Sequence, residues 1–480
     1  MTTYQRSLRP KQSTQLVGLF LCTLLGLVAA RRLVWPSVGS LVLVALCVLA
    51  ICRHRSVVGF VALLLCGFLF GWLRGSVYMR HLADYQALFN RTIVITAVAE
   101  TDAIYSDKGQ LSLDASHVVV QQPQALLLAG KIKLEGRGEA MVYRGDQLFV
   151  NGKLSPTRGA AQARMSFASI KVTQRQQSQL DVWRRRFIAG LQSSIPEPEA
   201  SFGAGLLLGQ RSTIPKEVND QLSATGLTHL VAVSGYNLTI IIMAVRKLLQ
   251  KGSKFQIVMA AGGLMLIFVM LTGLSASIVR ASLVSGLSLL AWYYGRQFKP
   301  VLLLAATAAM TASWNPFYIW SDIGWYLSFL AFFGVLVIAP AIIGLRRKSP
   351  KLLGSLVTET VSAQIMTIPI IMYIFGRVSI IGLVANVLVV PLVPLAMLLT
   401  LIAGIGALSW LPVSGLLAWP AKTLLTYMID ISAQFSQLPH AAAELSIDAY
   451  SMTLAYGTIV LGVILLRRIG IRRKPLNVLE

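Results

Sequence analysis

The stretch GLTHLVAVSGYNLTIII, residues Gly226 to Ile242, combines two opposing preferences for solvent. Most of its residues are apolar enough to enter a lipid bilayer. Within two or three helical turns it also carries four small or polar residues, His229, Ser234, Gly235 and Asn237. Such a pattern is expected where one face of a membrane helix, or its beginning, meets water or substrate.

The composition of the whole chain is typical of a membrane protein. Of its 480 residues 55% are hydrophobic and only 13% are charged, far too apolar for one soluble core. Three apolar runs open the chain at 15–30, 34–52 and 57–73, and a cleavable leader does not explain three runs. Further spans are predicted near 229–246, 256–272, 275–294, 300–314, 318–344, 355–375, 377–392, 394–409 and 452–466, with 414–435 less regular. The sequence therefore predicts an α-helical polytopic membrane protein with roughly 12 transmembrane or re-entrant helices.

Residues 85–180 have a different pattern, in which apolar and polar residues alternate between Gly, Pro and Asp. This alternation predicts five or six short strands of a small barrel or sandwich inserted between the membrane helices. A closed five-stranded barrel of this size indicates the OB type, which often binds single-stranded nucleic acid or sugars. The strands hold few aromatic residues, only Tyr105, Tyr143, Phe149 and Phe167, so no base-stacking platform is evident. A scaffold or plug domain is an equally good interpretation.

The net charge of +24 can reflect either membrane topology or a polyanionic partner. Residues 91–177 contain eleven Lys or Arg and seven Asp or Glu, a net of +4, so most of the excess lies in the membrane part. The basic links fall on alternate loops, which predicts a multi-pass protein of the cytoplasmic membrane with both termini in the cytoplasm and the β domain outside.

The predicted domain order follows from these patterns. It comprises an N-terminal three-helix membrane region at 1–80, the β domain at 85–180, amphipathic interfacial helices at 181–210, a membrane domain at 211–470 and a basic tail at 471–480.

Four ionisable residues of the predicted membrane domain matter at bilayer depth: His229, Arg280, Asp322 and Glu359. Each costs about 2.5–3.5 kcal/mol at bilayer depth and is therefore a functional candidate. Arg280 lies about six residues into its helix, at a depth of ~9 Å. A side chain that snorkels to the interface, a structural pair with Asp322 and a pore-lining role all fit that depth.

The run FGRVSIIGLVANVLVVPLVP is interrupted by Gly382, Asn386, Pro391 and Pro394. Broken helices at membrane depth are tolerated where they line a wet cavity or are buried in protein. We expect a cavity-lining element here, and a tight hairpin is the alternative.

Residue spacing argues against enzyme chemistry. His229 and Ser234 are five residues apart, about 140° around a helix, so they cannot form a nucleophile and base pair within one helix. Asp322 with Asp430 is the only candidate pair of facing carboxylates, without a supporting Gly-Asp pair in a span. No two His have metal-ligand spacing, and no Gly-rich loop with Lys cradles phosphates. We therefore expect no catalytic residue, metal or cofactor.

Four ordered motifs in the membrane part carry a resemblance to a known family. They contain Gly209, Gly226, His229, Ser234 and Gly235; Gly273, Ser275, Arg280 and Ala281; Asn315, Pro316, Asp322, Gly324, Leu327 and Ser328; and Phe375, Gly376, Asn386 and Pro391. From about residue 20 to 467 the chain resembles the ComEC-type competence proteins, the channels of bacterial DNA uptake.

The resemblance implies a channel that passes single-stranded DNA across the cytoplasmic membrane in natural transformation. The implied DNA-path residues are His229, Ser234, Gly235, Asn237, Arg280, Asp322, Ser328 and Asn386, with Arg280 as the phosphate contact. Besides DNA and the lipid bilayer, the implied partners are a cytoplasmic ATP-driven translocase, a separate nuclease and an extracytoplasmic DNA receptor, and a homo-oligomer is compatible with the family.

Two features depart from the family pattern. Asn237 stands where a second His is common, which puts any role for two imidazoles in doubt. Many members also contain a metallo-β-lactamase-like nuclease domain, whose His-x-His-x-Asp-His run this sequence lacks, so no nuclease activity is expected. A secondary transporter of another, anionic, solute is the alternative function, because broken helices and buried charges would look the same.

Overall fold

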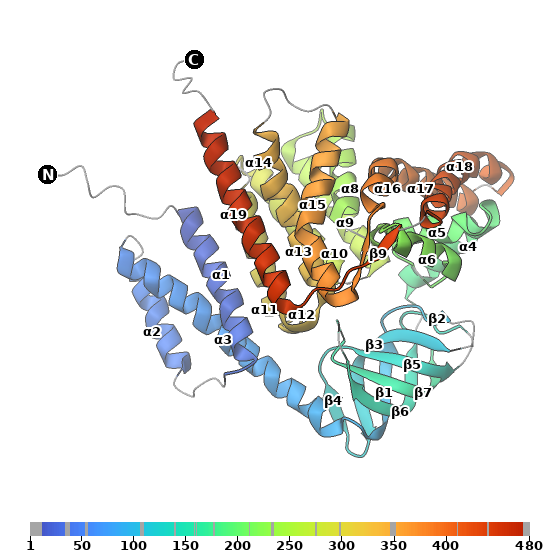
Figure 1. Cartoon of the computed structure of the whole chain (residues 1–480). Helices are drawn as coiled ribbons and strands as arrows, with labels where there is room; N and C mark the ends of the chain where they lie inside the picture. The colour runs from blue at the N-terminus through green and yellow to red at the C-terminus, as the bar shows by residue number, and fades with distance from the viewer. Residues whose placement is uncertain are drawn as a thin grey trace. The chain divides into compact units, whose positions relative to one another are not determined.

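The computed structural model describes residues 12–473, except 34–38, 53–55, 106–109, 139–140, 158, 160, 176–177, 211, 232–234, 274–275, 297–298, 346–351, 410 and 439–440. The chain divides into two compact units (Figure 1). The first unit comprises Met1–Asp181 and Gly295–Tyr326, and the second comprises Val182–Tyr294 and Leu327–Glu480.

The helices of the first unit pack through glycines. They are α1 (Gln12–Ala30), α2 (Gly39–Cys52), α3 (Val57–Leu88), α11 (Pro300–Trp314) and α12 (Phe317–Ser321). A Cβ atom added at Gly26 of α1 would lie 1.9 Å from the Phe68 carbonyl oxygen of α3, and one at Gly71 of α3 would lie 2.0 Å from the Thr23 oxygen of α1. With Gly67 and Gly75, Gly71 forms a repeat at every fourth residue of α3. Only glycine lets the two backbones approach this closely.

The β domain of the first unit contains β1 (Thr92–Ala99), β2 (Ile104–Tyr105), β3 (Leu111–Gln122), β4 (Leu126–Leu128), β5 (Ile132–Gly138), β6 (Gln147–Pro156) and β7 (Ala163–Gln174). The five longer strands pair in the order β1-β6-β7-β5-β3, and β3 pairs again with β1, which closes the ring. All these pairings are antiparallel except β5 with β7. The apolar residues alternate inward and fill one core, as the sequence pattern predicted.

The second unit is helical. Its elements are α4 (Gln179–Ser194, which begins at the unit boundary), α5 (Glu199–Leu208), α6 (Lys216–Ala224), α7 (Thr228–Val231), α8 (Gly235–Leu248), α9 (Lys254–Thr272), α10 (Ala276–Tyr293), α13 (Ile323–Phe333, whose first turn belongs to the first unit), the π-helix η2 (Gly334–Ile338), α14 (Ala339–Ile343), α15 (Leu352–Phe375), β8 (Arg377–Ser379), α16 (Gly382–Val389), the 3₁₀ helix η3 (Val390–Leu392), α17 (Val393–Ser409), α18 (Leu411–Ser436), β9 (Ala442–Glu444) and α19 (Ala449–Arg473). Among the described residues of both units, seven helices are long and apolar enough to cross a membrane. The chain is thus a helical protein of the membrane class with a small inserted β domain.

Several helices of the second unit are irregular. Of the span predicted at 229–246, the described residues are helical in α7, up to Val231, and in α8, from Gly235. The run predicted at 377–392 begins as strand β8 and continues as α16, η3 and α17, so helix persists through Pro391 instead of reversing in a tight hairpin. Proline removes a backbone donor, which explains the 3₁₀ turn at that point.

Candidate functional site

The polar stretch that begins at Gly226 follows a helix end. Gly226 has a left-handed φ of 70°, its N–H donates to the Ser223 carbonyl, and the Leu227 N–H donates to the Leu222 carbonyl. This is a Schellman motif, which needs glycine at this position. His229 follows on α7, exposed, with Nδ1 3.0 Å from the Gly226 carbonyl oxygen. The stretch therefore begins as a turn between α6 and α7.

This turn contacts the beginning of α16. A Cβ atom on Gly226 would lie 3.2 Å from Ser379 Cβ and 3.8 Å from Gly382 Cα. Beside it, Thr225 Oγ1 and Ser432 Oγ of α18 are hydrogen-bonded at 3.1 Å in a fully buried position. Two motifs that are about 150 residues apart in sequence thus meet through glycines. Sequence reasoning missed Thr225, Ser379 and Ser432; only Thr225 stands directly beside a glycine in the sequence, which was the one available signal.

Ser234 lies outside the described residues, and Gly235 is the first residue of α8. Asn237, one turn further, is buried, and its Nδ2 donates to the Leu206 carbonyl oxygen at 3.3 Å. Leu206 lies in the last turn of α5, where carbonyls have no partner within the helix. Asn237 therefore ties the start of α8 to the end of α5.

Arg280 is the largest fully buried side chain among the residues that the structure describes, with 2% of its surface exposed. It lies on α10, and its Cζ atom is 5.6 Å from the ring centroid of Phe329 on α13, a cation–π arrangement. The predicted Ser328, which is half-buried, immediately precedes Phe329. The guanidinium is enclosed by protein, so the snorkelling interpretation is wrong.

Asp322 has a local structural role. It is buried between α12 and α13, and its Oδ1 accepts a hydrogen bond from the Trp325 N–H at 3.2 Å. A carboxylate at this position caps the first turn of a helix, in this case α13. Asp322 belongs to the first unit and Arg280 to the second, so their pairing stays a prediction.

Asn386 is buried in the helix that follows the Gly226 contact. It lies one turn after Gly382 on α16, and 8% of its surface is exposed. Its neighbours Ala385 and Val389 belong to the main apolar core of the second unit. Among the described residues, Asn386 Oδ1 has no hydrogen-bond partner. Such a group costs about 1–3 kcal/mol, which needs a functional or structural reason.

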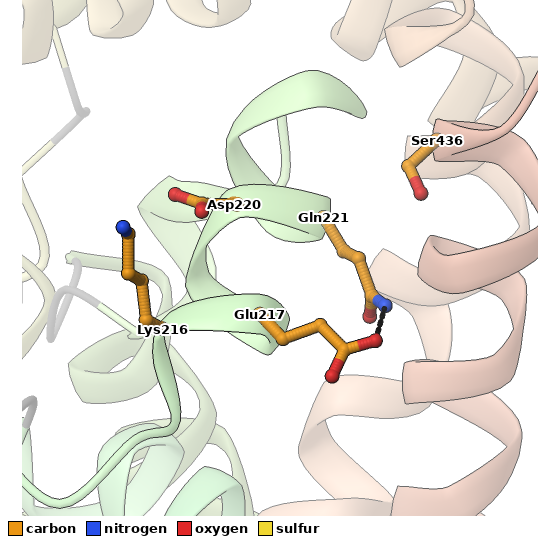
Figure 2. Close-up of a pocket in the computed structure, with 5 residues that line it drawn as sticks. All are labelled: Lys216, Glu217, Asp220, Gln221 and Ser436. Carbon is orange, nitrogen blue, oxygen red and sulfur yellow. Dashed lines mark hydrogen bonds between the residues drawn. The ribbon is translucent and has the colours of Figure 1, made fainter.

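Two hollows of the second unit lie apart from the predicted residues. One, of about 450 Å³, is lined by Lys216, Glu217, Asp220 and Gln221 of α6 and by Ser436 of α18 (Figure 2). The other, of about 470 Å³, is apolar and lies between α17 and α18. In the hollow lined by α6, Gln221 Nε2 donates to Glu217 Oε1 at 3.4 Å. The side chains that line this hollow carry both signs of charge, which does not favour an anionic ligand.

No cluster of three or more potential metal-ligating side chains occurs in the part of the chain that the structure describes.

Comparison with known proteins identifies the family of the chain. The model of the family described as "Competence protein" matches residues 206–469, more than half of the chain. ComE operon protein 3 of Bacillus subtilis (strain 168) is 27% identical over 278 residues, which are 55% of this chain and 34% of that relative. The chain thus matches about a third of the relative's length. No solved structure matches. The chain belongs to the competence protein family and is of the ComEC type.

Proposed function

We propose that this protein is a DNA-uptake channel, which passes single-stranded DNA across the cytoplasmic membrane during natural transformation. The observation that carries the proposal is the enclosed guanidinium of Arg280 within the part of the chain that matches the competence family. A transported strand presents one negative charge per nucleotide, and a fixed cation contacts phosphate without reading sequence.

The surroundings of Arg280 support this role. A buried cation at membrane depth is costly and marks ion or substrate paths more often than packing. The ring of Phe329 offsets part of that cost, and a guanidinium is the side-chain group best suited to a bidentate phosphate contact. The 3₁₀ segment η3, which joins α16 to α17 at Pro391 in the same unit, is the kind of irregular element that lines wet cavities in transporters.

The remaining candidates differ in how far their contacts support them. Asn386 is the next strongest, because its side-chain oxygen is buried and unsatisfied among the described residues. Asn237 and Asp322 each already serve a helix end. His229, Ser234, Gly235 and Ser328 complete the proposed DNA path on sequence grounds alone.

The proposed architecture includes features beyond the membrane class. We assign the β domain to the OB type, which the ring order β1-β6-β7-β5-β3 supports. The domain boundaries remain those predicted at 1–80, 85–180, 181–210, 211–470 and 471–480. Roughly 12 membrane or re-entrant helices, an outside β domain and cytoplasmic termini complete the arrangement.

The proposed partners are single-stranded DNA, an ATP-driven translocase on the cytoplasmic side, a nuclease and a DNA receptor outside. Self-association is compatible with this assembly.

The test is DNase-protected uptake of end-labelled DNA in cells that lack the gene. Wild type should restore uptake, and Arg280→Ala should not. Arg280→Lys should restore part of it, because the lysine ammonium keeps the positive charge but cannot form the two parallel hydrogen bonds of a guanidinium. Arg246→Ala is the matched control, since Arg246 is an exposed cation that stacks on Trp292 at 4.6 Å within the same unit. All variants must reach wild-type levels in the membrane.

Two outcomes would contradict the proposal. If uptake persists without the gene, the chain does not carry DNA, and transport of another anionic solute becomes the leading function. If Arg280→Ala and Arg246→Ala lower uptake equally, Arg280 has no special role in the path.

A further inference from the structure

Phe167 of the β domain combines two unfavourable features. Its side chain is 92% exposed, more than any other large apolar side chain among the described residues. Its backbone φ is 55°, in the left-handed region that side chains larger than glycine rarely adopt. An exposed Phe gains no burial that would offset this strain. Strained residues of this kind concentrate at binding sites.

The fold holds Phe167 in this position through a β-bulge. Pairing of β6 with β7 shifts by one residue between Asn151 and Lys153, and pairing of β5 with β7 shifts between Leu134 and Gly136. Inside the bulge, Ala168 is buried against Gly136, where a Cβ would lie 1.9 Å from the Ala168 oxygen. The bulge therefore turns Ala168 inward and Phe167 outward.

The surface around this ring is aromatic and basic. Along the outer face of β6 and β7, Phe149 lies opposite Lys171, and Lys153 lies opposite Ser166. Arg137 of β5 lies beside Ser169. Phe149 is 39% exposed, and its position is three residue pairs from Phe167, or about 10 Å along the strands. We call Phe149, Phe167, Lys153, Lys171 and Arg137 the Phe167 face.

The three cations of this face are available for a ligand. Arg137, Lys153 and Lys171 are exposed, and none forms an ion pair within the part of the chain that the structure describes. Glu135 of the neighbouring strand β5 forms ion pairs with Lys133 and Arg164. Aromatic rings on which bases stack, flanked by lysine and arginine for the backbone, are the composition of a single-strand binding surface.

From this geometry we propose that the Phe167 face binds single-stranded DNA outside the membrane path, with bases stacked on Phe167 and Phe149 and phosphates held by Lys153, Lys171 and Arg137. The proposal rests on the proposed function only for the identity of the ligand. Binding is independent of base sequence, because a ring stacks on any base and the cations contact only the backbone.

The experiment measures binding of a fluorescein-labelled oligo-dT strand of about 20 nucleotides to the purified full-length protein in nanodiscs by fluorescence anisotropy. The decisive variant is Phe167→Gly. Glycine adopts the same φ without strain, so the variant folds at least as well as wild type. Loss of the stacked ring should weaken binding roughly 5- to 150-fold. Phe167→Tyr keeps a ring and should bind within about threefold of wild type.

Two further variants separate stacking from strain and charge. His117 of β3 is also exposed and has a φ of 51°, so His117→Gly relieves equivalent strain without removing a ring of the face and should leave binding unchanged. Lys171→Gln should lower the slope of log Kd against log salt by roughly 0.7, the contribution of one phosphate contact to a single strand.

Unchanged binding by Phe167→Gly would overturn the inference and assign the ring to a lipid or protein contact. Wild-type protein that does not bind the strand would overturn it as well. Neither result bears on uptake in the deletion strain, which tests the channel separately.

Discussion

Small residues have different roles in two regions of the molecule. One region is the helix pair α1 and α3 of the first unit, and the other is the set of helices around Arg280 and Asn386 in the second unit. In the pair, α3 continues for 32 residues without a break, and glycines bring it into backbone contact with α1. Its Arg74 donates from Nε to the Ser313 carbonyl at 2.9 Å, so the cation serves packing. In the second unit, glycines mark places where helices stop or change pitch, as at Gly226 and Gly334.

This difference indicates which unit is the scaffold. Close, continuous packing gains dispersion energy. The buried Arg280 and Asn386 of the second unit cost stability that a scaffold has no reason to lose. Natural proteins accept such losses at functional sites. The predictions that follow test whether the two regions respond to substitution as scaffold and site.

The largest effect is expected at the glycine contact. Gly71→Ala places a Cβ 2.0 Å from the Thr23 carbonyl oxygen, which cannot move without separating α1 from α3. We expect a loss of about 3 kcal/mol, measured as a lower Tm in detergent. Gly263→Ala in α9, where a Cβ meets nothing within 4 Å, is the matched control and should be neutral or gain up to about 1 kcal/mol. If both substitutions changed the Tm equally, close glycine packing would not explain the stability of the α1–α3 pair.

The next effect is a gain of stability. Asn386→Leu keeps the branching and the number of side-chain heavy atoms and removes a buried oxygen without a partner among the described residues. The variant should gain about 1–2 kcal/mol in thermal unfolding and lose DNA uptake. A lower Tm would instead mean that the Asn386 side chain is needed for folding, and the contrast between the two units would weaken at this residue.

Asp322 should behave as a helix cap. Asp322→Ala removes the acceptor of the Trp325 N–H and should lower stability by about 1 kcal/mol. Asp322→Asn keeps an oxygen at the same position and should retain both stability and uptake. Loss of uptake in a stable Asp322→Asn variant would show that the charge itself acts in the DNA path.

The smallest effect concerns the ion pair of the β8–β9 sheet. Arg377 Nη2 and Glu444 Oε1 lie 3.0 Å apart, but both side chains are more than 70% exposed. A double-mutant cycle to Ala should give a coupling energy below about 0.5 kcal/mol. A coupling of several kcal/mol would indicate that a partner or membrane surface covers this sheet.

Periodic patterns predicted the regular parts of the protein. The alternation in 85–180 located the strands, because each strand buries one face in the barrel core. The Pro391 region was predicted as irregular, because proline removes a donor wherever it occurs.

Features that depend on distant residues could not be read from the sequence. The bulge at Phe167 forms only because β5 and β6 both pair with β7, so a list of aromatic residues gave no binding surface. The cap at Asp322 was accessible, since an Asp directly before an apolar helix is a start signal. The Gly67, Gly71 and Gly75 repeat was also accessible, as spacing of four in an apolar run signals close helix packing.

The two-stranded sheet has a mechanical consequence. Residues 377–379 pair with 442–444, and the Leu445 N–H extends the ladder to the Gly376 carbonyl at 2.9 Å. The chain from α16 to α18 therefore forms a loop whose two ends are hydrogen-bonded to each other, next to the Gly226 turn. A displacement of α16 would therefore move both paired strands. Because β9 leads into α19, such a displacement would also shift the start of that helix.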